Sequence, residues 1–159
     1  MISIRKFKES DIENKVKWIN DEENNQYLHY ELPLDVEKTR NWFKNKNDSK
    51  RYDAVIEYEG IPVGLIGLLD IKDGKAEYYV IIGDKKFKKK GIGIEATKLI
   101  IEYGKNVLKL NSVIGYTETG NENMINLFLK SGFEEVELIK NSAKNRDRIV
   151  DRYFFEYKF

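Results

Sequence analysis

The sequence predicts an α/β protein, of the α+β kind, with a central mixed and mostly antiparallel sheet flanked by helices. Three strand-like segments lie in the first half, Tyr52–Tyr58, Val63–Ile71 and Ala76–Ile82. The Asp73-Gly74 pair between the last two is typical of a tight hairpin, so we expect an antiparallel meander. In the second half, segments with strand and helix patterns alternate, which indicates a mixed sheet.

The N-terminal part combines one strand with two helices. A first strand begins at Ile2 and extends to about Phe7. Ser10 followed by Glu13 has the pattern of a capping box, which predicts a helix from there to about residue 20. Asp35 is placed to cap a second, shorter helix.

Between those helices lies a polar and aromatic segment, Asp21–Pro33. Its side chains include Tyr27, His29 and Tyr30, which are candidate substrate-binding residues. The segment either lines a substrate pocket or forms a lid packed on the core, and the sequence does not choose between these. A lone histidine serves as a catalytic base or as a packing residue.

The second half continues the alternation of helix and strand. Glycines 64 and 67, inside an expected strand, point to a bulge or to a close backbone approach. The remaining expected elements are a helix from the glycine loop to about Val107, a strand at Ser112–Thr117, a helix at Asn121–Ser131, a strand at Phe133–Lys140, a charged loop at Asn141–Asp147 and a last strand at Ile149–Tyr157.

Composition narrows the class of protein. The chain has 159 residues, 41% of them hydrophobic, which suits a single domain over residues 1–159 with a real core. The net charge of +1 argues against general binding to nucleic acid or to an anionic membrane. With no cysteine and only one histidine, neither a thiolate nucleophile nor a metal site is expected. We see no signal peptide or membrane span and expect a cytoplasmic protein.

The most informative stretch is a basic, glycine-rich loop between a strand and a helix, Lys88–Ala96. Gly91 and Gly93 let the backbone adopt unusual torsion angles and let a ligand approach closely. The free amides of the next helical turn and the positive end of its dipole form an anion site suited to phosphates. Read as Gly-x-Gly-x-x-Ala, the loop is also compatible with a dinucleotide fingerprint, but residues 83–90 separate it from its strand. A flexible loop with a solvated lysine run is the structural alternative.

Two motifs together resemble a known family. Lys88-x-x-Gly91-x-Gly93 resembles the acetyl-CoA loop of the GNAT N-acetyltransferases, Gln/Arg-x-x-Gly-x-Gly/Ala, with lysine in place of the usual glutamine or arginine. The segment Asn121–Phe133 is similar to the GNAT pattern Asn-x-x-Ala-x-x-Leu-Tyr-x-Lys-x-Gly-Phe. Both motifs occur in the family's order with the expected elements between them. The ends of the chain resemble the branch of ribosomal-protein N-terminal, polyamine and nucleotide-amino-sugar acetyltransferases.

The resemblance implies a GNAT fold, whose sheet splays beside the glycine loop to admit the pantetheine arm of acetyl-CoA. It also implies cofactor contacts from one strand, the loop and a later helix. The residues concerned are Tyr79, Val80, Ile81, Ile82, Lys88, Lys89, Lys90, Gly91, Ile92, Gly93, Ile94, Asn121 and Phe128. Asn121 would contact the cofactor or only cap its own helix.

The implied reaction is direct attack of an amine on the thioester of acetyl-CoA. It needs a base for the ammonium proton and a proton for the leaving sulfur. Glu77 is the candidate base, or an ordinary strand residue. The family usually has a tyrosine as acid where this chain has Phe128, which cannot donate a proton. The proton donor in its place is Tyr116, on the neighbouring strand, or a water molecule.

The resulting expectation is an acetyl-CoA-dependent N-acetyltransferase acting on a small-molecule or peptide amine, as a monomer or homodimer. A non-catalytic CoA-binding module of the same fold stays open because of Phe128. A dinucleotide-binding oxidoreductase is the remaining alternative.

Overall fold

The computed structural model describes residues 1–159, and its centre is one seven-stranded sheet. The strands are β1 (Ile2–Lys6), β2 (Tyr52–Tyr58), β3 (Ile61–Lys72), β4 (Lys75–Ile82), β5 (Ser112–Glu118), β6 (Glu134–Asn145) and β7 (Arg148–Lys158). They lie in the order β1-β2-β3-β4-β5-β7-β6. Every neighbouring pair is antiparallel except β4 and β5, which run parallel. The predicted mixed, mostly antiparallel sheet is confirmed.

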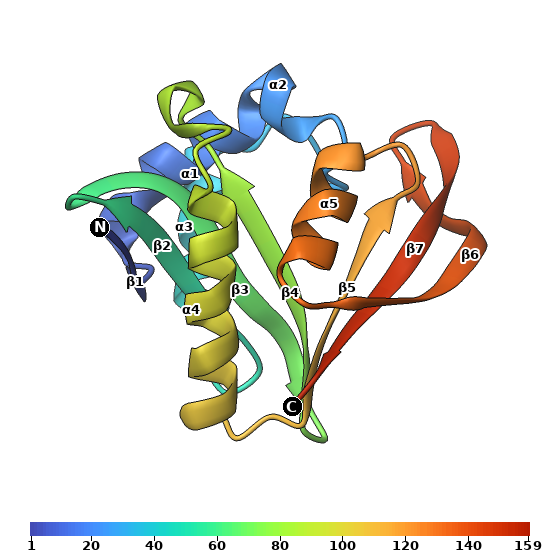
Figure 1. Ribbon diagram of the computed structural model, residues 1–159. Coiled ribbons are helices and arrows are strands. Elements are labelled where there is room, and N and C mark those ends of the chain that lie inside the picture. Colours follow the sequence, from blue (N-terminus) through green and yellow to red (C-terminus); the bar gives the residue numbers. More distant parts are fainter.

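Helices cover both faces of this sheet (Figure 1). On one face lie α4 (Ile92–Asn106) and α5 (Glu122–Lys130), and on the other lie α1 (Ile12–Asn20) and α3 (Val36–Asn45). A four-residue helix, α2 (Glu22–Asn25), lies within the polar and aromatic segment and was not predicted.

Two hydrophobic clusters fill the space between the layers. Side chains alternate across a strand, so Ile66 joins the cluster under α4 while its neighbour Leu65 joins the cluster under α1. This explains why β3 is nearly continuous in apolar residues: both of its faces are covered. A Cβ on Gly67 would lie 2.5 Å from the main-chain oxygen of Tyr52 and 2.6 Å from the ring of Tyr79, so this glycine serves the close backbone approach that was one of its two predicted uses.

The start of α1 differs from the prediction. Asp11 precedes the helix, whereas Ser10 was expected to cap it. The Asp11 carboxylate accepts a hydrogen bond from the Lys8 amide at 2.9 Å and two from the Arg5 guanidinium at 2.8 and 2.9 Å. A charged aspartate held by arginine is the stronger acceptor, so the turn at residues 9–11 forms around Asp11.

The predicted charged loop at residues 141–147 is also wrong. β6 continues to Asn145 and pairs with β7 as a long hairpin, which leaves only residues 146–147 as the turn. β6 is the edge strand of the sheet and most of its side chains are exposed. Charged residues are tolerated on such a strand, so their abundance did not signal a loop.

The feature that creates the functional site is the separation of β4 from β5. The two strands pair only at Lys75, Ala76 and Glu77. From Tyr78 to Ile82, β4 is paired with β3 alone, and the strands form an open wedge in Figure 1. The main-chain groups of this part of β4 therefore have no strand partner on the β5 side.

Candidate active site

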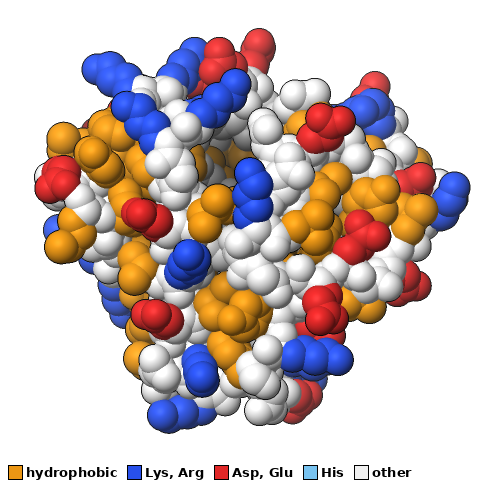
Figure 2. All heavy atoms as spheres, in the orientation of Figure 1, with side chains coloured by type: hydrophobic (Ala, Val, Ile, Leu, Met, Phe, Trp, Pro, Cys, Tyr) orange, Lys and Arg blue, Asp and Glu red, His pale blue; other side chains and the backbone are white.

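A large open groove begins in the wedge between β4 and β5. Its volume is about 1720 Å³, and residues of β4, β5, α5, the glycine loop and the segment 26–35 line it. In Figure 2 this side of the molecule is hollowed near the top, with lysine and arginine side chains beside the opening. The groove thus connects the predicted cofactor residues with the predicted substrate residues.

The glycine loop forms one wall and has the geometry of an anion site. Gly91 is the N-cap of α4 and has a φ of 77°, in the left-handed region, and Lys89 has a φ of 62°. No side chain caps the helix, so its first amides remain available to a ligand. Lys88, Gly93 and Ile94 also line the groove.

Two of the loop residues predicted to contact the cofactor do not line the groove. Ile92 is buried in the core cluster under α4, and neither Ile92 nor Lys90 lines the groove. Only the main chain of Ile92 remains a candidate contact, because the side chain anchors the helix. Lys88 donates a hydrogen bond to Asn24, and Lys85 lies 3.3 Å from the carboxylate of Glu23. These contacts join the loop to α2.

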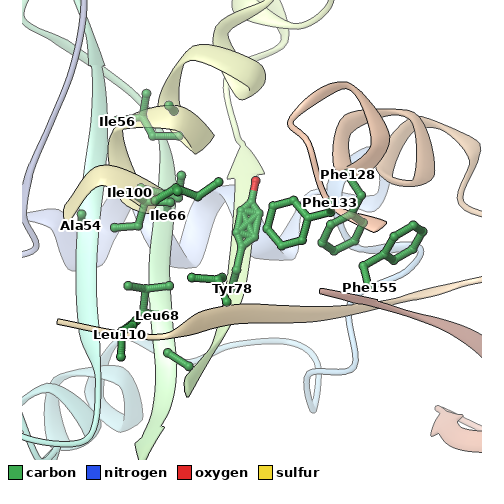
Figure 3. Packing of buried hydrophobic residues seen from close by; sticks show 14 of the residues in the cluster. Ala54, Ile56, Ile66, Leu68, Tyr78, Ile100, Leu110, Phe128, Phe133 and Phe155 are labelled. Atoms are coloured by element: carbon green, nitrogen blue, oxygen red, sulfur yellow. The ribbon is translucent and has the colours of Figure 1, made fainter. Parts of the chain in front are cut away.

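Phe128, unlike most of the other predicted cofactor residues, does not line the groove. Its side chain is 1% exposed and stacks on Phe155 with ring centroids 4.3 Å apart (Figure 3). Its ring atoms lie 2.6 Å from the position of a Cβ on Gly115, so the absence of a side chain there makes room for it. Phe128 is absent from the groove lining and its side chain belongs to the core, so a cofactor contact by this side chain stays a prediction that its burial does not support.

One side of α5 faces the groove through residues that were not among the predicted site residues. They are Asn123, Met124, Asn126, Leu127 and Lys130. Met124 follows Asn121 by three residues and Leu127 follows Met124 by three, so helical spacing was an available signal for these two. Asn121 itself both lines the groove and caps α5, accepting a hydrogen bond from the Met124 amide at 3.2 Å.

Glu77 and Tyr116 both line the groove, on adjacent strands. Glu77 is paired with Ile114 at the last position before β4 and β5 diverge. Burial and the nearby charge of Asp70 raise the pKa of Glu77, although Arg152 opposes them. The Arg152 guanidinium lies 4.4 Å from the centroid of the Tyr116 ring. A half-buried carboxylate with a raised pKa suits proton transfer.

The polar and aromatic segment crosses the other side of the groove. Tyr27, His29 and Tyr30 all line it. The Tyr27 hydroxyl donates to the Gly120 carbonyl at 3.0 Å, and His29 Nε2 lies 2.9 Å from Oε2 of Glu118. Other side chains of the segment, such as Leu28 and Leu32, pack against the core cluster under α1. The segment is therefore both a lid packed on the core and a wall of the groove.

A basic and aromatic cluster lies beside α1 and α3, and most of its members line the groove. We define it as Lys15, Trp42, Arg51, Asp53 and Tyr79. Arg51 donates two hydrogen bonds to Asp53, at 2.7 and 2.8 Å, and Tyr79 donates a third at 2.5 Å. Burial raises the pKa of Asp53, but these hydrogen bonds outweigh it and hold the pKa below its usual value. Apart from Tyr79, the members of this cluster carry no local signal in the sequence, because only the fold brings them together.

Comparison with known proteins agrees with this geometry. Residues 2–134 match the family model described as "Acetyltransferase (GNAT) domain". The chain belongs to the GNAT acetyltransferase family. As a GNAT acetyltransferase it takes the acetyl group from acetyl-CoA and transfers it to an amine.

Individual relatives cover almost the whole acetyltransferase. It is 25% identical over 162 residues to the uncharacterized N-acetyltransferase p20 of Bacillus licheniformis, covering 97% of this chain and 90% of that one. The ribosomal-protein-alanine N-acetyltransferase of Brucella melitensis has a similar structure, with a TM-score of 0.85, 26% identity and 99% of both chains covered. The spermidine N-acetyltransferase of Vibrio cholerae, solved with CoA and spermine, has a TM-score of 0.90 at 18% identity, covering 99% of this chain and 95% of that one.

The acetyltransferase groove fits acetyl-CoA on two structural grounds. The uncapped amides that follow Gly91, whose backbone is in the left-handed region, suit a pyrophosphate. The side of β4 that has no strand partner suits the amides of the extended pantetheine arm. No helix of the protein combines the length and apolar character needed to cross a membrane.

Proposed function

We propose that acetyl-CoA occupies the wedge between β4 and β5. The amides of Lys89–Ile94 would hold its pyrophosphate, and the main chain of Tyr79–Ile82 would pair with its pantetheine arm. The observation that carries this proposal is the end of β4–β5 pairing at Glu77, beside an uncapped helix N-terminus.

The lysines near the loop would supply a positive field and a partner for the 3′-phosphate. Lys88 is engaged with Asn24, while Lys89 and Lys90 are exposed. Because several lysines share this role, we expect each one singly to be dispensable. Asn121, with its oxygen used in the helix cap, would offer its amide nitrogen to the cofactor.

When bound, acetyl-CoA supplies a thioester carbonyl open to attack by an amine. We assign Glu77 the removal of the acceptor's ammonium proton, directly or through a water molecule. Its raised pKa brings the carboxylate closer to the pKa of an amine, which makes the transfer easier. The Tyr116 hydroxyl is our candidate proton donor, because Phe128 is sealed in the core.

The acceptor is a small-molecule or peptide amine that lies between β4 and the segment carrying Tyr27, His29 and Tyr30. Two proteins of similar structure are named as acetyltransferases of spermidine and of a ribosomal-protein alanine. Both small-molecule and protein acceptors therefore occur among proteins similar to this chain. We further propose that residues 1–159 act as one domain in the cytoplasm, as a monomer or homodimer, with neither nucleic acid nor membrane as a partner. The near-zero net charge supports the last point.

The experiment is a CoA-release assay with acetyl-CoA and a panel of amino sugars, polyamines, amino acids and peptide N-termini. We expect turnover with a subset of the panel and mass-spectrometric detection of the acetylated amine. The matched control is Glu77→Gln, which keeps the side-chain shape and removes the base. Tight CoA binding with no turnover of any amine would contradict the assignment of the acceptor site.

A further inference from the structure

Lys15 occupies an unusual place for a lysine. It lies on the buried face of α1 with Ile12, Trp18 and Ile19, and the residue is 8% exposed. Its ammonium makes no hydrogen bond or ion pair within the protein and lies 3.5 Å from the centroid of the Trp42 ring. Burying an unpaired charge is costly, even over an aromatic face. Burial accordingly lowers the pKa of Lys15, to about 8.

Asp53 is the one carboxylate that acts on Lys15, and its oxygens are already hydrogen-bonded to other side chains. Asp53 receives two hydrogen bonds from Arg51 and one from Tyr79. The Arg51 guanidinium lies 4.9 Å from the Trp42 ring, so two cations share that aromatic side chain. Against the single charge of Asp53, the cluster therefore carries one positive charge in excess.

The excess charge faces the groove. Lys15, Trp42 and Arg51 line it together with Glu77. Tyr79 of the cluster lies two residues from Glu77 on the same face of β4, a distance of roughly 7 Å at the rise of a strand. A molecule with its amine at Glu77 can therefore reach the cluster with a short extension.

We propose that the cluster binds an anionic oxygen group of the acceptor, a carboxylate or a phosphate, with the Lys15 ammonium as its principal partner. This inference rests on the proposed function, because it places the acceptor amine at Glu77. An anionic site distinguishes this chain from enzymes whose acceptor carries a second ammonium group, since that group would be repelled by Lys15 and Arg51.

The carboxylates of the groove support this choice. Asp35 accepts hydrogen bonds from the amides of Glu37 and Lys38, and Glu118 is held by Asn145 and lies against His29. Glu23 pairs with Lys85, so of the five carboxylates that line the groove only Glu31, which is exposed, and Glu77, the proposed base, have no partner in the protein. Lys15, by contrast, is a groove-lining cation without a hydrogen bond or ion pair.

The test uses four series of linear primary amines with equal chain lengths: ω-amino carboxylates, ω-aminoalkyl phosphates, n-alkylamines and diamines. Turnover is measured as kcat/KM, and binding is measured by calorimetry in the presence of CoA. We expect at least a tenfold preference in kcat/KM for one anionic series over the alkylamines, with the diamines poorest. The comparison of carboxylates with phosphates identifies the anion.

Lys15→Met keeps the length of the side chain and its contact with Trp42 but removes the charge. We expect it to abolish the anionic preference, because kcat/KM for the anionic series should fall at least tenfold further than kcat/KM for the alkylamines. Lys17→Met, an exposed position on the same helix, is the matched control and should keep the preference. Melting curves of both variants verify folding, and removal of a buried charge should not lower the melting temperature of Lys15→Met.

The outcomes separate the two proposals. Anion-selective binding without turnover supports the cluster and contradicts the assigned base. Efficient turnover of diamines, an equal loss of all series in Lys15→Met, or acceptor binding with no charge preference overturns the anionic site and leaves the acetyltransferase assignment intact.

Discussion

Oε2 of Glu118 lies 2.9 Å from Nε2 of His29, although 89 residues separate the two in the chain. The same oxygen accepts a hydrogen bond from Asn145 at 2.6 Å, and the Glu118 residue is 5% exposed. One buried carboxylate therefore connects the segment over the groove, strand β5 and the β6–β7 hairpin.

This connection predicts that His29→Ala loosens the wall of the groove. We expect a higher KM for the acceptor, by several-fold, with little change in CoA affinity, because the glycine loop is unaffected. Tyr27→Phe is the control for the second tether, since it removes only the hydrogen bond to Gly120. Steady-state kinetics and calorimetry with CoA check this. Loss of CoA affinity in His29→Ala would show that the segment also shapes the cofactor site.

Gly91→Val should abolish acetyl-CoA binding. The residue has a φ of 77° and no atom lies within 4 Å of a Cβ built there, so a side chain would be strained and would point into open space needed by the ligand. Gly60→Val is a matched control, with a φ of 79°, equally open surroundings and a position outside the groove. Both variants should lose about 1–3 kcal/mol of stability. Calorimetry should show a loss of CoA binding in Gly91→Val only, and equal affinities would exclude the loop as the pyrophosphate site.

Glu77→Gln should lower kcat by about 10²–10⁴-fold at neutral pH, the usual contribution of a general base. The loss should shrink at high pH, where the amine deprotonates without help. In the wild-type enzyme activity should fall as pH decreases through the raised pKa of Glu77, because the protonated carboxyl cannot accept a proton.

Asp70→Asn tests whether the raised pKa of Glu77 sets the acidic limb of the pH profile. Asp70 is one of the causes of the raised pKa, so its neutralisation should move the acidic limb of the pH profile to lower pH and leave the plateau unchanged. A loss below about threefold in Glu77→Gln would identify Glu77 as an ordinary strand residue, since general bases contribute more.

Phe128→Tyr should destabilise the protein and not restore an acid. The end of the ring lies against Gly115 in the core, so the added hydroxyl would be crowded and without a partner, at a cost of about 1–3 kcal/mol. Thermal melting and CoA release should therefore show a lower melting temperature and no gain in kcat. A rise in kcat with retained stability would show that the hydroxyl reaches the groove and would reinstate this position as the acid site.

Local patterns in the sequence predicted most of the elements. The Asp73-Gly74 hairpin, the apolar run of β3 and the glycine loop before α4 depend on neighbours within a few residues, and such signals are readable along the chain. The two motifs were sufficient to indicate the GNAT family and hence the fold and the cofactor. At Ser10 the local pattern was misleading, because Arg5, from β1, holds the competing carboxylate of Asp11 at the start of the helix.

Only the tertiary structure decided which side chains line the groove and which are buried in the core. The sequence shows Lys15 as one of many lysines, and only the packing of α1 on Trp42 makes it a buried, unpaired cation. Likewise, Phe128 aligns with a catalytic tyrosine, but the missing side chain at Gly115 lets its ring turn into the core. Burial, pKa and the direction of a side chain depend on partners tens of residues away. They follow from strand pairing and packing, which local sequence patterns do not encode.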